Sequence, residues 1–198
     1  EGGLFQGVLL NDAASFGGGI YGSNNALVRI QSNNFDKEAA VVVSNTASNG
    51  GGIGVSSGSL LLLQDAVISN NAATSTGGGI RANNAHVMIH RVKPGAQCHS
   101  EVRCSQISGN SATGTSASFS GGGAIATFGG TLEITGTYIE DNSANYGSAI
   151  RARFMPMDGF NTPMTLGGNV FSGNQTAPQV LYIYEPSADI AFSTFLDS

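Results

Sequence analysis

The sequence predicts an all-β protein folded as a right-handed parallel β-helix, a three-sided solenoid of about six coils. Two alternating patterns predict it. In the first, an asparagine lies three positions after an apolar residue, and a small residue lies two positions after the asparagine. This pattern begins at Val8, Val42, Ile68, Ile107, Ile139 and Phe171. The second is a glycine-rich stretch that ends in isoleucine, at Ile20, Ile53, Ile80, Ile125 and Ile150.

The spacing of these isoleucines defines the coil. The successive steps are 33, 27, 45 and 25 residues, and the sixth copy is expected at Ile183, 33 residues after Ile150. Each coil therefore has 25 or more residues, and the longer coils carry loop insertions near 31–41, 91–106, 113–121 and 151–163. No linker or composition change interrupts the repeat, so residues 1–198 form a single β-helix segment.

Three short strands are expected in each coil. One lies around the glycine-rich stretch and its isoleucine, and another ends at the asparagine motif. Between them lies a strand with two apolar residues two positions apart, which face the same side and therefore the core. These apolar pairs begin at Val28, Leu61, Val87, Leu132, Met164 and Ile190.

The repeated asparagines are expected to stack at a corner of the coil. A side-chain amide both donates and accepts hydrogen bonds, so stacked asparagines can satisfy the backbone at a tight turn. The predicted ladder contains Asn11, Asn45, Asn71, Asn110, Asn142 and Asn174. The glycines allow a positive φ or a close approach of stacked backbones.

Both ends of the sequence fall inside the repeat. Residues 194–198 match residues 137–141, which places Leu196 in the column of Ile139. Solenoids need capping ends for solubility, so we expect a fragment of a longer chain. Its edge strands would pair with the remainder of its own solenoid or with neighbouring copies.

Composition excludes some partners. The net charge is -5 and the eight Lys and Arg residues are scattered, which argues against binding to nucleic acid. No apolar run approaches the ~20 residues needed to cross a bilayer, so this segment is not expected to insert into a membrane. Cys98 and Cys104 lie in one insertion. We expect a local disulfide between them that closes this loop, which would indicate an oxidising compartment; two free thiols are the alternative.

No catalytic residues, metal site or cofactor site are expected. The acidic residues occupy different positions of the repeat, whereas glycoside cleavage needs a pair of converging carboxylates. His86 and His90 would both point outward from one strand, about 13 Å apart, which is too far to share a metal ion. The glycine runs lack the Gly-Lys-Ser/Thr ending of a phosphate loop. We therefore expect a protein that is not an enzyme.

The insertions are the expected place for binding residues, because loops on a rigid scaffold often carry function. The candidates in these loops are Arg91, Lys93, His99, Arg103, Arg151, Arg153, Phe154 and Phe160. The alternative is that the insertions are tolerated bulges without a ligand.

The alternation of Gly-Gly-Ile with apolar-x-x-Asn resembles the GG[AILV] and FxxN repeats of polymorphic outer membrane proteins, which build the passenger β-helices of autotransporters. Phe171-Ser172-Gly173-Asn174 fits FxxN literally, and the other copies have Ile or Val in the first position. The resemblance covers nearly the whole chain. It implies a secreted or cell-surface rod with a structural or adhesive role, no catalytic residues, and surface glycans or proteins as partners.

Two alternative functions stay open. A carbohydrate-active β-helix, similar to polysaccharide lyases or hydrolases, would show an acidic cluster or a deep groove beside residues 91–106. A subunit of an extracellular fibre or appendage would use its ends to contact another copy.

Overall fold

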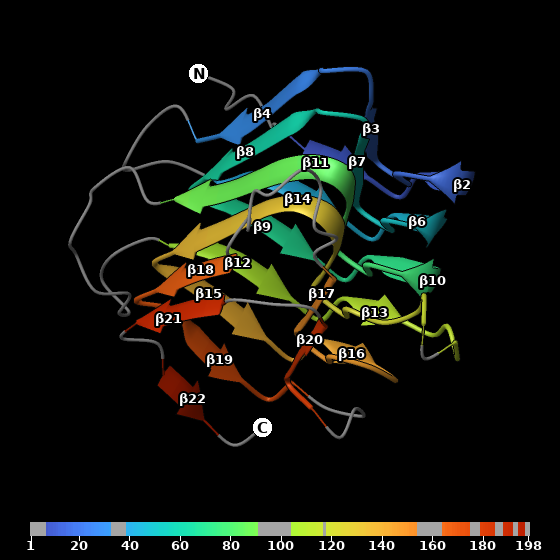
Figure 1. Cartoon of the computed structure of the whole chain (residues 1–198). Coiled ribbons are helices and arrows are strands. Elements are labelled where there is room, and N and C mark those ends of the chain that lie inside the picture. The colour runs from blue at the N-terminus through green and yellow to red at the C-terminus, as the bar shows by residue number, and fades with distance from the viewer. Residues whose placement is uncertain are drawn as a thin grey trace.

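The computed structural model describes residues 7–32, 39–90, 104–116, 118–153, 164–174, 179–184, 188–191 and 194–196. Of residues 188–191, the second-last strand, only the backbone is described. The described residues form β-strands and turns, and every strand pair between coils is parallel. Figure 1 shows the coils stacked in order from one end to the other. The described part contains no helix that could span a membrane.

The first face of the solenoid is a seven-stranded parallel sheet that holds the apolar-x-x-Asn motifs. Each of the first six strands ends two residues before its asparagine. The strands, in spatial order, are β1 (Gly7–Leu9), β5 (Ala40–Val43), β9 (Ala66–Ser69), β12 (Ser105–Ser108), β15 (Thr137–Glu140), β19 (Val170–Ser172) and β22 (Thr194–Leu196).

The second and third faces belong to one ten-stranded sheet that bends between two columns. The column that starts with the isoleucines contains β3 (Ile20–Gly22), β7 (Ile53–Ser56), β11 (Ile80–His90), β14 (Ile125–Thr135), β17 (Ile150–Arg153) and β20 (Leu181–Tyr184). The column of apolar pairs contains β4 (Leu27–Gln31), β8 (Leu60–Gln64), the second halves of β11 and β14, β18 (Met164–Gly167) and β21 (Ala188–Ala191).

A five-stranded sheet, which the sequence did not predict, follows the asparagine corner. It contains β2 (Asp12–Phe16), β6 (Thr46–Asn49), β10 (Ala72–Thr76), β13 (Ser111–Ala112) and β16 (Ser143–Ala144). Figure 1 shows these short strands projecting to one side of the other sheets. The prediction of three strands per coil therefore omitted a fourth. These strands are short and mostly polar, so they carry no apolar pattern that a sequence reading can detect.

The core confirms which residues face inward in the middle coils. The isoleucines Ile53, Ile80, Ile125 and Ile150 are fully buried in one column. The apolar pairs and the motif residues complete the same cluster with Leu61, Leu63, Val87, Ile89, Leu132, Ile134, Met164, Leu166, Val42, Ile68, Ile107, Ile139 and Phe171. Side chains from all three faces therefore meet in one continuous core.

The register of the last coil differs from the prediction. Ile150 pairs with Leu181 and not with Ile183, and Leu166 pairs with Ile190, so the apolar pair begins at residue 188. Side chains alternate with period two, so a shift of two residues preserves the inward face and leaves no trace in the apolar pattern.

The final strand is shifted by one residue relative to the sequence match. Phe195, and not Leu196, continues the column of Ile139 and Phe171. The rings of Phe171 and Phe195 stack with centroids 4.7 Å apart and planes 5° apart. This aromatic contact favours the observed register over the one in which Leu196 covers Phe171.

The insertions are only partly described. Residues 33–38, 91–103 and 154–163 lie outside the described residues. Residues 151–153 were assigned to an insertion, but they belong to β17, so that expectation was wrong at its start. In the segment 113–121, residues 113–116 and 118–121 connect β13 to the bend before β14.

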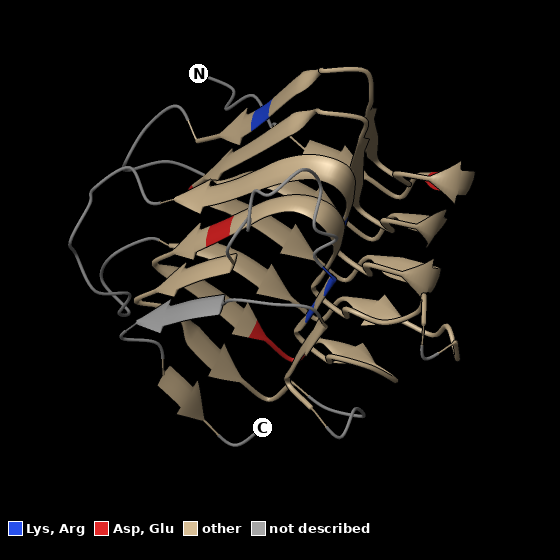
Figure 2. Ribbon diagram, viewed as in Figure 1, with Lys and Arg blue, Asp and Glu red and all other residues tan. Residues whose placement is uncertain are grey.

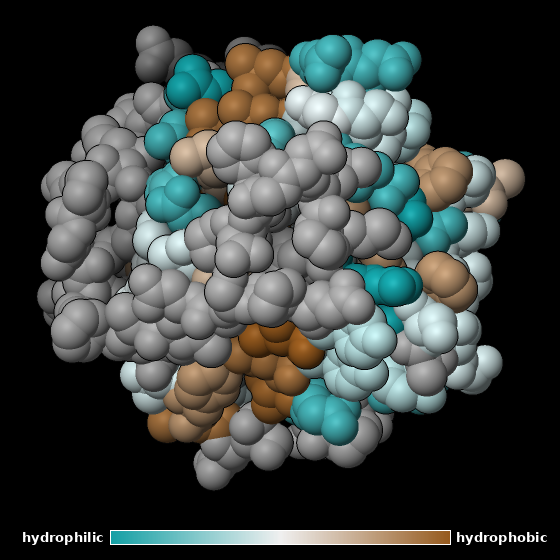
Figure 3. Space-filling view, in the orientation of Figure 1, coloured by the Kyte–Doolittle hydropathy of each residue, from teal (hydrophilic) through white to brown (hydrophobic). Residues whose placement is uncertain are grey.

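Large apolar side chains are exposed at both ends of the described solenoid. Leu10 is 81% exposed and Leu27 is 65% exposed at the first coil, and Phe195 and Leu196 are exposed at the last. Figure 3 shows apolar side chains gathering near both ends of the face in view. Of these four residues, only Phe195 continues an inward column, and its equivalents Ile139 and Phe171 in the coils before it are fully buried.

Candidate functional site

The predicted asparagines form a hydrogen-bonded ladder through the solenoid. The side-chain Oδ1 of each asparagine after Asn11 accepts two hydrogen bonds from the asparagine of the preceding coil, one from its backbone N–H and one from its Nδ2. The ten distances lie between 2.8 and 3.1 Å, from Asn11 and Asn45 through Asn71, Asn110 and Asn142 to Asn174. All except Asn11 are buried. The ladder is therefore a structural element of the core.

Each glycine of a glycine-rich stretch meets a different constraint, as coil two shows. Gly50 has a φ of +64°, which L-residues rarely adopt. A Cβ on Gly51 would overlap the carbonyl oxygens of Ala72 and Gly78 in the next coil. A Cβ on Gly52 would lie 2.9 Å from the side-chain Cγ of Asn71. The glycines therefore allow the short fourth strand and the ladder to pack directly against the backbone.

Several candidate residues fall outside the described part of the chain. These are Arg91, Lys93, Cys98, His99, Arg103, Phe154 and Phe160. Cys104, which is described, is disulfide-bonded, and Cys98 is the only other cysteine in the sequence.

Arg151 and Arg153 lie in strand β17, so they are not loop residues. Arg151 is only 2% exposed, although the sequence suggested a surface contact residue. Its guanidinium donates a hydrogen bond to the backbone carbonyl of Ser120, in the segment that connects β13 to β14. Arg151 therefore anchors this connection to the outer face of the sheet. Arg153 is half-buried two residues further along the same face.

The structure combines these arginines with aromatic residues from other coils. Outward positions of the isoleucine column, one residue after each core residue, contain Tyr21, Gly54, Arg81, Ala126, Arg151 and Tyr182. Two residues further along each strand, the positions contain Ser56, Asn83, Phe128, Arg153 and Tyr184. We call the set Phe16, Tyr21, Arg81, Phe128, Tyr146, Arg151, Arg153, Tyr182 and Tyr184 the arginine–aromatic band.

Guanidinium groups and rings alternate along this band. The Arg81 Cζ lies 5.1 Å from the ring centroid of Phe16 and 5.6 Å from that of Phe128. The Arg151 Cζ lies 5.6 Å from the centroid of the same Phe128 ring, on strand β14, and 5.4 Å from that of Tyr182, on strand β20. These separations are within the range of cation–π attraction, about 6 Å. The band therefore links the first coil to the sixth by contacts between outward side chains.

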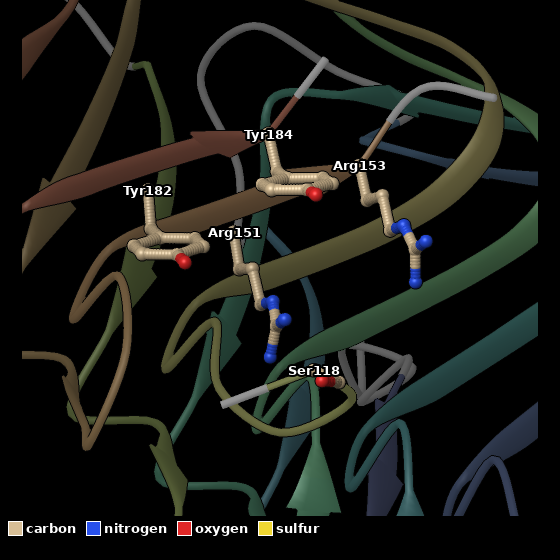
Figure 4. A pocket seen from close by; sticks show the side chains of 5 residues that line it. All are labelled: Ser118, Arg151, Arg153, Tyr182 and Tyr184. Atoms are coloured by element: carbon tan, nitrogen blue, oxygen red, sulfur yellow. The ribbon is translucent and has the colours of Figure 1, made fainter. Parts of the chain in front are cut away.

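The last two coils form a square of four side chains around a pocket. Arg151 pairs with Tyr182 in the strand register, and Arg153 pairs with Tyr184. The Arg153 Cζ lies 5.4 Å from the Tyr184 ring. Figure 4 shows both arginines extending side by side from β17, with the two rings in the same order on β20. Together with Ser118, these four residues line a cavity of about 180 Å³.

The pocket is electrostatically positive. Arg153 forms no ion pair with a carboxylate in the described part of the chain, and its Nε is buried without a hydrogen-bond partner there. Burial lowers the pKa of Arg151, and the nearby Arg153 charge lowers it further, while Tyr182 and Tyr146 act in the opposite direction. Figure 2 shows how sparse charged residues are on the rest of the described ribbon. Two neighbouring guanidiniums are therefore a distinctive local feature.

The aromatic half of this site was missed from the sequence. A signal existed, because Arg151-x-Arg153 and Tyr182-x-Tyr184 both place two like residues on one face of a strand. Assigning the sixth copy to Ile183 shifted the register by two residues. Tyr184 then appeared opposite Arg151, and Tyr182 had no partner. Only the observed pairing of Ile150 with Leu181 produces the square.

Among the described residues, the remaining titratable side chains do not gather into a second site. In the described residues, no group of three or more His, Cys, Asp and Glu side chains could hold a metal ion. His86 Nδ1 lies 2.9 Å from Thr131 Oγ1, and His90 Nε2 lies 3.9 Å from Glu133 Oε1. Glu140 is the last residue of β15 and Asp141 follows it; burial, and to a lesser extent the Asp141 charge, raise the pKa of Glu140.

The fold and the band define this chain as a parallel β-helix with a cationic and aromatic outer surface. Comparisons with protein-family models, curated proteins and solved structures give no match. The resemblance to polymorphic outer membrane protein repeats therefore rests on the repeated residues alone.

Proposed function

We propose that this chain is a non-enzymatic, adhesive segment of a large secreted or cell-surface β-helix protein, of the polymorphic outer membrane protein type. The observation that carries the proposal is the arginine–aromatic band on a rigid, repetitive scaffold. Arginine and tyrosine are the side chains most enriched at binding hot spots, because they combine a large contact area with directional hydrogen bonds.

The scaffold supports this role through its stiffness. The ladder from Asn11 to Asn174 and the continuous core connect every described coil to its neighbours. Outward side chains on such a scaffold keep fixed positions, which lowers the entropy lost on binding. A disulfide at Cys104 fits an oxidising, extracellular location.

Adhesion can be tested with the purified chain. We would immobilise it on a biosensor surface and measure binding to a panel of extracellular polysaccharides and matrix proteins. Binding to at least one member, weakened by Arg153→Gln, is expected. Absence of binding to every member would contradict an adhesive role. Incubation with the same polysaccharides should leave their size distribution unchanged, and depolymerisation would instead indicate the carbohydrate-active alternative.

A second candidate function, the fibre subunit, is favoured by the apolar ends. Leu27 in β4, at one end, and Phe195 and Leu196 in β22, at the other, are exposed large hydrophobic residues on edge strands. Such edges readily pair with another strand, and a second copy stacked end to end would bury them. Electron microscopy and sedimentation of the chain would show filaments or head-to-tail oligomers in this case, and monomers otherwise.

A further inference from the structure

We propose that the pocket formed by Arg153, Tyr182, Tyr184 and Ser118 binds an acidic sugar unit of an extracellular polysaccharide, through its carboxylate or sulfate group. This inference rests on the proposed adhesive function and names the ligand class of the same surface.

The anion would be held by Arg153. Its guanidinium lies over the Tyr184 ring, with Cζ 5.4 Å from the ring centroid, and forms no ion pair in the described part of the chain. A guanidinium that uses its face against a ring still has in-plane N–H donors, which match the two oxygens of a carboxylate or sulfate. Arg151 adds a second positive charge beside it while it anchors Ser120.

The sugar ring would be held by the tyrosines. One side of a pyranose ring presents C–H groups, which pack well against an aromatic face, and its hydroxyls bond to polar groups at the rim. Tyr184 is 48% exposed, and β20 is the last strand of its column, so no described strand covers the ring from that side. The phenol groups and the exposed Ser118 hydroxyl supply hydrogen-bond partners.

The volume of the pocket suits a ligand with a single small ring. A cavity of ~150 Å³ accommodates a benzene ring, and drug-sized ligands need about 300 Å³ or more. The observed cavity of about 180 Å³ therefore suits one six-membered sugar ring. An acidic peptide would offer the carboxylate but not the ring for the tyrosine faces. For that reason we favour a glycan over a peptide.

The test is a direct titration of the full 198-residue chain. The probes are fluorescently labelled polygalacturonate, which has carboxylates, and dextran sulfate, which has sulfate esters. Neutral dextran and poly-L-glutamate are the comparison probes. We expect saturable binding to one or both acidic glycans that weakens as salt is raised. Neutral dextran and poly-L-glutamate should bind at least about tenfold more weakly.

Variants locate the site. Arg153→Gln should weaken glycan binding about tenfold, because a charge-assisted hydrogen bond is lost. Arg153→Lys, which keeps the charge without the planar fork, should give an intermediate loss. Arg29→Gln is the matched control, because it removes one exposed positive charge at the opposite end of the solenoid. It should change affinity by less than about twofold. Thermal unfolding by circular dichroism would verify that each variant is folded.

The contrary results are distinct. Equal losses in Arg153→Gln and Arg29→Gln would show unspecific charge attraction and overturn the site. Binding to poly-L-glutamate as tight as to the glycans, or binding only to a protein of the adhesion panel in an Arg153-dependent way, would overturn the glycan class and leave the adhesive function intact. Absence of binding to every glycan and every panel member would overturn both proposals.

Discussion

The backbone N–H and the side-chain Nδ2 of Asn71 both donate to the same oxygen atom, Oδ1 of Asn110, each at 3.0 Å. The same Nδ2 donates to the carbonyl of Val42 in the preceding coil, also at 3.0 Å. One side chain therefore joins three coils in the stack. Since it is fully buried, no water can replace these bonds.

The ladder should be a major source of stability. Asn71→Ala removes the acceptor for the Asn45 N–H and Nδ2 and leaves the Val42 carbonyl without its donor. Buried groups that lose their partners cost about 1–3 kcal/mol each, so we expect destabilisation by at least about 3 kcal/mol in urea unfolding. Asn145→Ala is the control, because Asn145 is exposed and its Nδ2 donates to the carbonyls of Thr113 and Gly114 at the surface. Equal effects of the two substitutions would contradict a structural role for the ladder.

Glycine substitutions should distinguish positions where a Cβ would collide with the neighbouring backbone from positions where there is room for one. Gly51→Ala places a methyl group onto the carbonyls of Ala72 and Gly78, so we expect a loss of about 1–3 kcal/mol in thermal unfolding. Gly167→Ala is the matched control in strand β18, where a Cβ would lie 3.7 Å from Thr135 Cγ2 and φ is not positive. It should be neutral or slightly stabilising, by up to about 1 kcal/mol. A neutral Gly51→Ala would mean that the fourth strand packs less closely than the structure shows.

Alanine substitutions in the last strand can decide its register. Phe195→Ala removes the ring that stacks on Phe171, whereas Leu196→Ala removes a side chain on the opposite side of the strand. Aromatic pairs contribute about 0.5–1.5 kcal/mol beyond their buried area, so Phe195→Ala should lower the unfolding midpoint more than Leu196→Ala. The reverse order would support the register suggested by the sequence match.

Stability should depend on the protonation of Glu140. Burial, and to a lesser extent the Asp141 charge, raise its pKa in the folded protein. The folded state then binds the proton more tightly than the unfolded state, so this group favours folding below its ordinary pKa. The contribution is lost as pH rises through the raised value.

Glu140→Gln should therefore be more stable than the original chain near neutral pH and should lose this part of the pH dependence. Urea unfolding measured across the acidic range would show it. Because burial is the larger cause, Asp141→Asn should retain most of the effect. If Asp141→Asn removed the pH dependence as completely as Glu140→Gln, charge repulsion and not burial would be the main cause.

The candidate site was only half predictable from the sequence. Arg151 and Arg153 were chosen as binding candidates because they were assigned to the insertion 151–163, but Arg151 is buried in β17 and anchors Ser120. Tyr182 and Tyr184 were not chosen. Their role depends on which residue of the next coil lies opposite Arg151, and the glycines that mark this position in earlier coils are absent there.

The sequence by itself determined the parallel stacking, the length of a coil, the inward residues of the middle coils and the asparagine ladder. These features repeat at fixed offsets, and a buried column demands the same residue type in every coil, so each copy confirms the others. The tertiary structure alone decided the short fourth strand, the register of the last coil and the arginine–aromatic band. Outward positions carry no such demand, so their residues vary from coil to coil. Only the hydrogen-bonded pairing of neighbouring strands brings Arg153 and Tyr184 together.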